Sequence, residues 1–139
     1  MKYIALIFLS ISLLFSAEIV KVDGSYADAL TIAKKDGKKL MVMMTTRVCP
    51  WCKRAKKNTL TNDKVIEAVN KDYIFVEIDR DRDRDEYPED LYSRMVPTFS
   101  LVDSKNEELL YQIIGYRPPS KFLKEINLDE DDKDDEDDL

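Results

Sequence analysis

The chain has 139 residues, of which 44% are apolar, and this suffices for one domain with one packed core. It contains no histidine, which excludes Ser-His-Asp and Cys-His hydrolases and removes the commonest metal ligand. The net charge is −6, but residues 129–139 hold nine acids and one lysine, a net −8, which leaves +2 for residues 1–128. A nearly neutral body predicts no nucleic-acid partner, because such a partner requires a clustered basic face.

The first 17 residues have the pattern of a targeting segment. Met1 and Lys2 give a positive start, and the run from Tyr3 to Ala17 is apolar apart from its serines. A transmembrane helix needs about 20 apolar residues, so residues 1–17 are predicted to be a secretory signal peptide. An uncleaved membrane anchor is the second interpretation, and a buried core element is the third. Export to the periplasm, or elsewhere outside the cytoplasm, would place the cysteines where disulfides persist.

The first predicted elements are a strand, a helix and a second strand. Residues 18–22 alternate in polarity, as a strand does. Ser25 is a good helix N-cap and Gly37 a good helix end, so we expect a helix that runs to about Asp36. The residues expected on its buried face are Tyr26, Ala29, Leu30 and Ala33. The apolar run at residues 40–44 indicates a central strand buried on both faces, although so short a run does not exclude a helix.

After the two cysteines the chain continues with helices and a strand. Residues 53–58 extend the helix that begins at the cysteines, and residues 62–70 form a second helix. Residues 73–78 alternate again and form a strand. Residues 79–90 are so highly charged that we expect a surface loop. A proline opens a short helix over residues 88–94.

The last third of the domain is predicted to hold two strands and a helix. The strands cover residues 98–102 and 109–114 and are joined by a short hairpin-like turn. A helix over residues 118–128 follows, opened by one of two prolines. The domain, residues 18–128, is therefore of the α/β class, with a central mixed sheet and helices on both faces. The acidic residues 129–139 cannot bury apolar surface and are predicted to be a disordered tail.

The motif Cys-Pro-Trp-Cys at residues 49–52 places two cysteines on the first turn of a helix. Side chains three residues apart on a helix lie on the same side, so the pair can close a disulfide. Cys49 would lie at the helix N-terminus, where unpaired N–H groups and the helix dipole stabilise its thiolate, the attacking form. Cys52 would be less exposed and would resolve the mixed disulfide. The nearby cations Arg47 and Lys53 add weakly to this stabilisation.

Three other interpretations of the cysteine pair compete with a redox pair. It could be a structural disulfide, although so small a loop contributes little stability. It could hold zinc or an iron–sulfur cluster across a dimer, because one chain with two cysteines and no histidine lacks the further ligands. It could also be a chance occurrence. Its position after a buried strand and before a helix favours the redox interpretation.

Several segments of the chain resemble the thioredoxin superfamily, over most of residues 18–128. They are Thr45-Thr46, Cys49-Pro50-Trp51-Cys52-Lys53, Val96-Pro97-Thr98-Phe99, and Gly115 before the last helix. The stretch from Thr59 to Val65 is similar to one in small exported thioredoxin-like proteins. It is also similar to one in the periplasmic C-terminal domain of the transmembrane thiol:disulfide interchange reductase. The resemblance implies a thioredoxin fold.

The resemblance also implies roles for residues outside the cysteine pair. It implies that Pro97 is a cis proline facing Cys49. It implies that the backbone of Val96 pairs with an extended substrate segment, which is a form of strand addition. Trp51 is expected to face solvent and to contact substrate, and its partial burial in the core is the alternative.

One departure from the family concerns the proton of Cys52. Thioredoxins usually carry a buried acid on the central strand, six residues before the first cysteine, and this chain has Met43 there. Proton transfer must then use water or another group, such as Glu77 or Asp79. The sequence does not decide between these groups.

The sequence as a whole predicts a thiol–disulfide oxidoreductase that exchanges disulfides with exported proteins through Cys49 and Cys52. It requires no organic cofactor and no metal. Its partners would be protein thiols or disulfides and a membrane-bound or soluble redox partner, and the chain is expected to be a monomer. The direction stays open between reductase and isomerase. The alternative is a non-catalytic thioredoxin-fold binding or chaperone module in which the cysteines are incidental.

Overall fold

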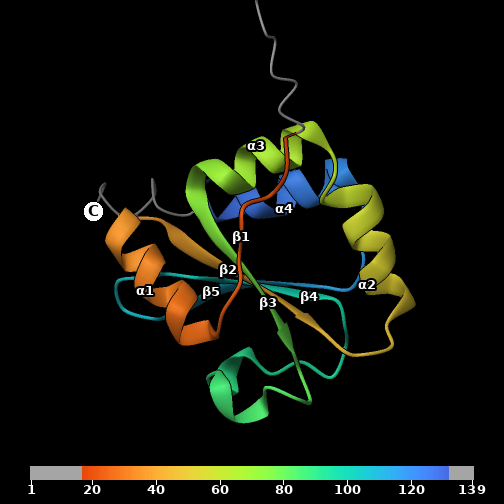
Figure 1. Ribbon diagram of the computed structural model, residues 1–139. Coiled ribbons are helices and arrows are strands. Elements are labelled where there is room, and N and C mark those ends of the chain that lie inside the picture. Colours follow the sequence, from red (N-terminus) through yellow and green to blue (C-terminus); the bar gives the residue numbers. More distant parts are fainter. Residues whose placement is uncertain (1–16, 132–139) are drawn as a thin grey trace, which may run out of the picture.

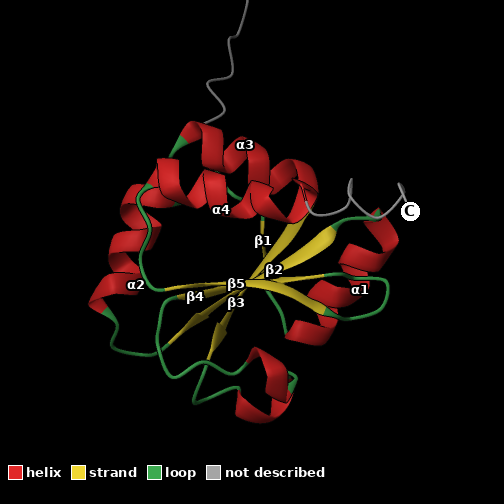
Figure 2. Cartoon of the chain, turned by 180° about the vertical axis from the view of Figure 1, so that it is seen from behind, coloured by secondary structure: helices red, strands yellow, loops and turns green. Residues whose placement is uncertain are grey.

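Five strands form one mixed sheet (Figure 2). The computed structural model describes residues 17–131. In their spatial order the strands are β1 (Lys21–Val22), β3 (Tyr73–Asp79), β2 (Lys39–Thr45), β4 (Thr98–Val102) and β5 (Leu109–Ile114). β1 and β2 run parallel to β3, whereas β4 is antiparallel to β2 and β5 is antiparallel to β4. The predicted mixed sheet is confirmed.

Helices cover both faces of this sheet, as predicted (Figure 1). In the described part of the chain the α-helices are α1 (Tyr26–Asp36), α2 (Pro50–Arg54), α3 (Asp63–Asp72) and α4 (Pro119–Asp131). α2, α3 and α4 pack on one face of the sheet. α1 packs on the other face, together with the loop between β3 and β4. The two cysteines belong to the core under α2, α3 and α4.

β2 is buried on both faces because its side chains alternate between the two cores. Met41 and Met43 belong to the core that includes the cysteines. Leu40, Val42 and Met44 belong to the core under α1. All five side chains are completely buried. The loop that carries the cysteines therefore leaves a strand that packing fixes from both sides.

α1 begins and ends at the residues that the sequence predicts. The hydroxyl of Ser25 accepts a hydrogen bond from the Asp28 N–H at 3.2 Å, and the Asp28 carboxylate accepts one from the Ser25 N–H at 2.9 Å. This reciprocal pair is a capping box. At the other end Gly37 adopts a left-handed conformation with φ of 64°, and its N–H donates to the Ala33 carbonyl.

The predicted helix over residues 88–94 is wrong. One 3₁₀ turn, Glu89–Leu91, is present there, and the backbone of Tyr92 is already extended, with φ of −61° and ψ of 131°. The carbonyl of Arg94 accepts a hydrogen bond from the guanidinium of Arg80 at 2.7 Å. The 3₁₀ turn does not extend into a helix because this contact with Arg80 and the burial of Leu91 keep the following residues out of a helical conformation.

β1 is shorter than the predicted strand at residues 18–22. Before Lys21 the backbone bonds to a side chain of α3 and not to a neighbouring strand. The Val20 N–H donates to the Asn70 side-chain oxygen at 2.9 Å, and the Asn70 amide donates to the Glu18 carbonyl at 2.8 Å. One asparagine thus replaces the strand pairing of this segment.

α4 begins at Pro119 and continues to Asp131, beyond the predicted end near residue 128. It therefore includes the first residues of the predicted acidic tail. Residues 132–139 of that tail, and residues 1–16 of the predicted signal peptide, lie outside the described residues. Within residues 17–131 no helix is long and apolar enough to cross a membrane.

Candidate active site

The two cysteines form a disulfide at the N-terminus of α2, with Cα atoms 5.2 Å apart. Cys49 is the N-cap residue of the helix and has an extended backbone. Its sulfur accepts a hydrogen bond from the Cys52 N–H at 3.1 Å. Pro50 occupies the first helical position, where a missing N–H costs nothing. The helix start therefore directs a backbone donor and its positive end at the first sulfur.

The two cysteines differ in exposure in the predicted order. Cys49 is 7% exposed and Cys52 is 3% exposed. The sequence places Cys52 one turn inside the helix, and the structure buries it more deeply. Both cysteines are buried, and Cys52 is the less exposed of the two.

The active-site helix does not continue as a plain α-helix. After Arg54 it changes into a π-helical turn, Ala55–Thr59, in which the Leu60 N–H donates to the Ala55 carbonyl at 3.0 Å. The Thr59 hydroxyl at its end donates to the Arg117 carbonyl. This bond ties the end of the helix to the segment that follows β5. The sequence did not predict the wider turn.

A cis peptide bond between Val96 and Pro97 lies before β4, as the resemblance implies. The Pro97 carbonyl accepts a hydrogen bond from the Gly115 N–H at 2.8 Å, which anchors this segment to the end of β5. Pro97 is buried and Val96 is half-buried. Within residues 17–131 the Val96 backbone N–H and carbonyl make no hydrogen bond to another backbone group.

Three residues that the sequence singled out, Trp51, Val96 and Gly115, line one apolar groove of about 320 Å³. Its lining residues are Trp51, Met95, Val96, Gly115 and Tyr116. Trp51 is 53% exposed, so the solvent-facing placement predicted for it is found and the core alternative is not. Met95, 60% exposed, and Tyr116 were missed by the sequence analysis. Both lie next to residues of recognised segments, Val96 and Gly115.

The chain that holds this cysteine pair at a helix start and this mixed sheet also matches the model of a known protein family. The model of the thioredoxin-like domain matches residues 26–128. The chain belongs to the thioredoxin-like domain family. No curated protein sequence matches the chain.

Solved structures show the thioredoxin fold of this domain. A protein described as a candidate disulphide-isomerase from Bacteroides thetaiotaomicron is 23% identical, with a TM-score of 0.71 over 82% of this chain and 94% of that one. A thioredoxin from Thermus thermophilus is 22% identical, with a TM-score of 0.64 over 80% and 86%. A DsbH oxidoreductase is 15% identical, with a TM-score of 0.58 over 81% and 86%. At these identities the likeness establishes the fold.

Arg54 of this thioredoxin-like domain lies against two aromatic rings. Its guanidinium carbon is 5.2 Å from the ring centre of Trp51 and 5.0 Å from that of Tyr116. The two ring centres are 5.9 Å apart. Such cation–π contacts hold a charged side chain in place while leaving its edge open to solvent. The spacing of three between Trp51 and Arg54 on a helix is the sequence signal that could have found this contact.

The buried position that carries an acid in thioredoxins is occupied by Met43, which is completely buried. Its register partner on β3 is Glu77, so the two residues lie side by side on parallel strands. Glu77 forms ion pairs with Lys56, which lies four residues after Cys52, and with Lys21 at 4.0 Å. Of the two acids named from the sequence, Glu77 is the one beside the active-site helix.

Asp79, the other acid, is used by the loop that follows β3. Its carboxylate accepts hydrogen bonds from the Asp81 and Arg82 N–H groups, both at 3.0 Å. A polar cleft of about 380 Å³ opens between this loop and the segment before the cysteines. The residues of the cleft that matter here are Arg47, Lys56 and Glu77. Water can therefore reach the ion pair of Glu77 from this side.

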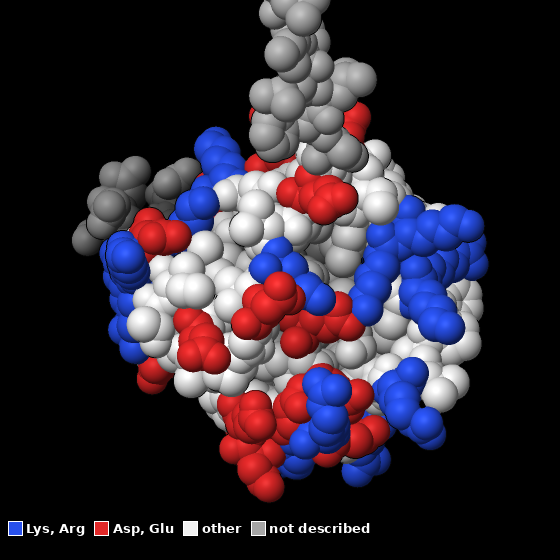
Figure 3. Space-filling model, viewed as in Figure 1, with Lys and Arg blue, Asp and Glu red and all other residues white. Residues whose placement is uncertain are grey.

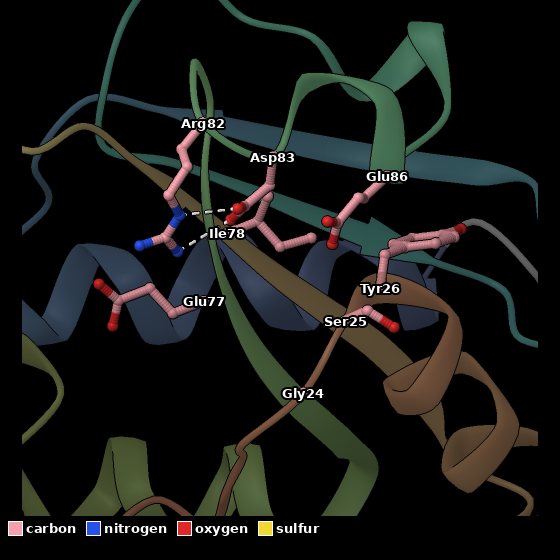
Figure 4. Close-up of a pocket in the computed structure, with 8 residues that line it drawn as sticks. All are labelled: Gly24, Ser25, Tyr26, Glu77, Ile78, Arg82, Asp83 and Glu86. Atoms are coloured by element: carbon pink, nitrogen blue, oxygen red, sulfur yellow. Dashed lines mark hydrogen bonds and ion pairs between the residues drawn. The ribbon is translucent and has the colours of Figure 1, made fainter.

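A second polar cavity, of about 160 Å³, lies at the N-terminus of α1 (Figure 4). Several of its polar groups are engaged in local contacts. Ser25 caps α1, and Arg82 pairs with Asp83 at 2.9 Å. The cysteines are not among its lining residues, and we assign it no chemistry.

Proposed function

We propose that the protein is a thiol–disulfide oxidoreductase that exchanges disulfides with exported proteins through Cys49 and Cys52. The observation that carries this proposal is the disulfide at the start of α2, with the more exposed of the two cysteines as the helix N-cap. In the reduced protein this position favours the thiolate, because the helix end presents N–H groups and a positive partial charge. A disulfide with only a structural role would not require Cys49 to be the N-cap residue of α2.

The exchange runs in two steps that balance atoms and electrons. The Cys49 thiolate attacks one sulfur of a substrate disulfide, which breaks the substrate S–S bond, forms a mixed disulfide and releases one substrate thiolate. That thiolate takes a proton from solvent. The Cys52 sulfur, after loss of its proton, then attacks the Cys49 sulfur and releases the second substrate thiol. Two electrons pass to the substrate, and the Cys49–Cys52 disulfide remains.

The apolar groove supports a protein substrate. Trp51 and Met95, which line it, offer exposed apolar surface. The backbone of Val96, before the cis Pro97, bonds to no other backbone group within residues 17–131 and can pair with an extended segment that carries the reacting cysteine. We assign substrate contact to Trp51 and Val96 on this ground, and to Pro97, which is buried and does not line the groove, from the family resemblance alone. A membrane-bound or soluble redox partner must restore the dithiol after each reduction, or the disulfide after each oxidation.

Trapping of the mixed disulfide tests this function. In Cys52→Ala the second step is blocked, so covalent complexes with substrate proteins are expected on non-reducing gels, and Cys49→Ala/Cys52→Ala is the matched control. The wild-type protein is expected to accelerate the reduction of insulin by dithiothreitol. Absence of complexes together with absence of insulin reduction would contradict the proposal. The reduction potential in a glutathione buffer then gives the direction, since a low value belongs to a reductase and a high one to an oxidant or isomerase.

Export is tested separately from the chemistry. We expect the mature protein in an exported fraction, with its N-terminus near residue 18. N-terminal sequencing of protein from fractionated cells measures both. An intact N-terminus in a membrane fraction would favour the uncleaved anchor, and an intact N-terminus in the cytoplasmic fraction would contradict export.

A further inference from the structure

Residues 47–57, which contain the active-site motif, carry five basic side chains and no acid. The five are Arg47, Lys53, Arg54, Lys56 and Lys57, and all are exposed. We call them the cationic face. Figure 3 shows basic side chains gathered over the α2 side of the molecule, whereas basic and acidic side chains are mixed over the loop between β3 and β4, at the bottom of the view.

The charge of this face is only partly neutralised. Lys56 pairs with Glu77, and Arg54 stacks on aromatic rings, which leaves its charge intact. Within residues 17–131, Arg47, Lys53 and Lys57 form no ion pair. Three cations that form no ion pair among the described residues, and a fourth on aromatic rings, therefore produce a positive field in front of this face.

Two members of the cationic face adjoin the cysteine motif in the sequence. Arg47 precedes Cys49 by two residues, and Lys53 directly follows Cys52. Arg54 connects the face to the apolar groove, because it contacts Trp51 and Tyr116, which both line that groove. A protein segment that lies in the groove therefore passes beside Arg54, on the helix that begins at Cys49.

We infer that the cationic face binds acidic residues beside the reacting cysteine of the protein partner, and so selects acidic partners. This inference rests on the proposed function, because the partner's disulfide must reach Cys49. The planar guanidinium of Arg54 can bind a carboxylate with two parallel hydrogen bonds. Arg47, Lys53 and Lys57 contribute mainly long-range attraction, which accelerates encounter and depends on salt.

The size of the effect follows from the combined field. One exposed ion pair contributes little, about 0–1 kcal/mol. Several like charges around one site raise association rates about 10-fold or more at low salt. At 1 M salt the screening length is about 3 Å, so this advantage should disappear.

Two disulfide-bridged peptides that differ only in their flanks, four glutamates against four glutamines, test the inference. The reduced full-length protein is mixed with each peptide, quenched with iodoacetamide, and analysed by mass spectrometry. At low salt the acidic peptide is expected to be reduced about 10-fold faster than the neutral one. Lys53→Gln/Lys57→Gln is expected to lower this ratio at least threefold. The matched control is Lys35→Gln/Lys105→Gln, two exposed lysines on α1 and the β4–β5 turn, and it should leave the ratio unchanged.

Each remaining outcome decides against a specific statement. Equal rates for the two peptides at low salt would overturn the inference, and this is the result expected if the chain's own acidic end occupies the face. An equal loss in the control variant would show that net charge, and not this face, sets the ratio, and would also overturn it. If the wild-type protein reduces neither peptide, the proposed function fails instead.

Discussion

α1 and α2 both begin after an extended N-cap residue and use its side chain differently. Each has an extended N-cap residue whose side chain accepts a hydrogen bond from an N–H of the first turn. At α1 the acceptor is the hydroxyl of Ser25, and the carboxylate of Asp28 completes the cap. At α2 the acceptor is the sulfur of Cys49. One helix start holds a fixed negative charge, and the other holds a sulfur that gains and loses its charge.

The first turns of α2 and α4 contain no acidic residue, whereas α1 has Asp28 and α3 has Asp63 there. An acid at this place stabilises a helix because it complements the dipole. It would also repel a thiolate on Cys49. α2 thus lacks the acidic residue that often stabilises a helix start. In the proposed chemistry, the Cys49 thiolate is the only anion required at this position.

Cys49→Ser should have the largest effect, because it keeps the cap and removes the nucleophile. Serine is among the best N-cap residues, so the free energy of unfolding measured in urea with dithiothreitol should stay within about 0.5 kcal/mol of the reduced wild type. Insulin reduction should fall about 1,000-fold or more, because the chain has no histidine to activate a hydroxyl. If Cys49→Ser kept a tenth of the wild-type activity, the N-cap of α2 would not require a sulfur, and the proposed difference between the two helix starts would be wrong.

Ser25→Ala should affect stability alone. Loss of the hydroxyl acceptor should lower the free energy of unfolding by about 1 kcal/mol, measured by urea denaturation. Insulin reduction should be unchanged, because α1 packs on the face of the sheet opposite α2. Lys35→Ala, an exposed substitution in the same helix, is the control and should change stability by less than about 0.5 kcal/mol. A loss of activity in Ser25→Ala would show that the two helix starts are coupled.

Pro50→Glu should give α2 the acid that it lacks. A carboxylate in the first turn competes with the Cys49 thiolate for the positive end of the helix, a difference of about 0.5 kcal/mol that corresponds to roughly a twofold to threefold effect. The rate of alkylation of Cys49 by iodoacetamide at pH 6 should fall accordingly, relative to Pro50→Gln. The glutamine variant controls for loss of the proline. Equal rates in the two variants would mean that the helix end does not govern the thiolate.

The smallest expected effect concerns the titration of Asp28. Hydrogen bonds from the Ser25 N–H and hydroxyl hold the pKa of the Asp28 carboxyl below its usual value. A lowered folded-state pKa stabilises the protein above the unfolded pKa, about 3.9 for aspartate, and this contribution is lost as the pH falls. The stability difference between the wild type and Asp28→Asn should therefore shrink between pH 6 and pH 3. Urea midpoints at these pH values measure it, and a difference that grows on acidification would refute the sign.

Much of this fold was predictable because its signals are local. Ser25 and Gly37 delimit α1 through cap chemistry, and the apolar run of β2 indicates burial on two faces. The cysteine motif was recognisable because its chemistry depends on a spacing of three residues. The cis Pro97 required the family resemblance, since no local property of the sequence distinguishes it from a trans proline.

The features that escaped prediction depend on long-range contacts or on local charge. The segment at residues 88–94 is held by Arg80, which lies earlier in the chain, and the π-helical turn ends on a hydroxyl bond to the Arg117 carbonyl. Tyr116 meets Arg54 only in the folded chain. The near-neutral total for residues 1–128 also concealed the cationic face, because an average charge does not report where the charges gather.

Trp51 has a consequence for experiments. It is the only tryptophan of the chain, it stands between the two cysteines, and half of its surface is in contact with solvent. A disulfide quenches the fluorescence of a nearby indole ring by accepting an electron from the excited ring, whereas a thiol quenches it less. The protein therefore carries its own optical probe, whose brightness should rise when the disulfide opens and fall when it closes.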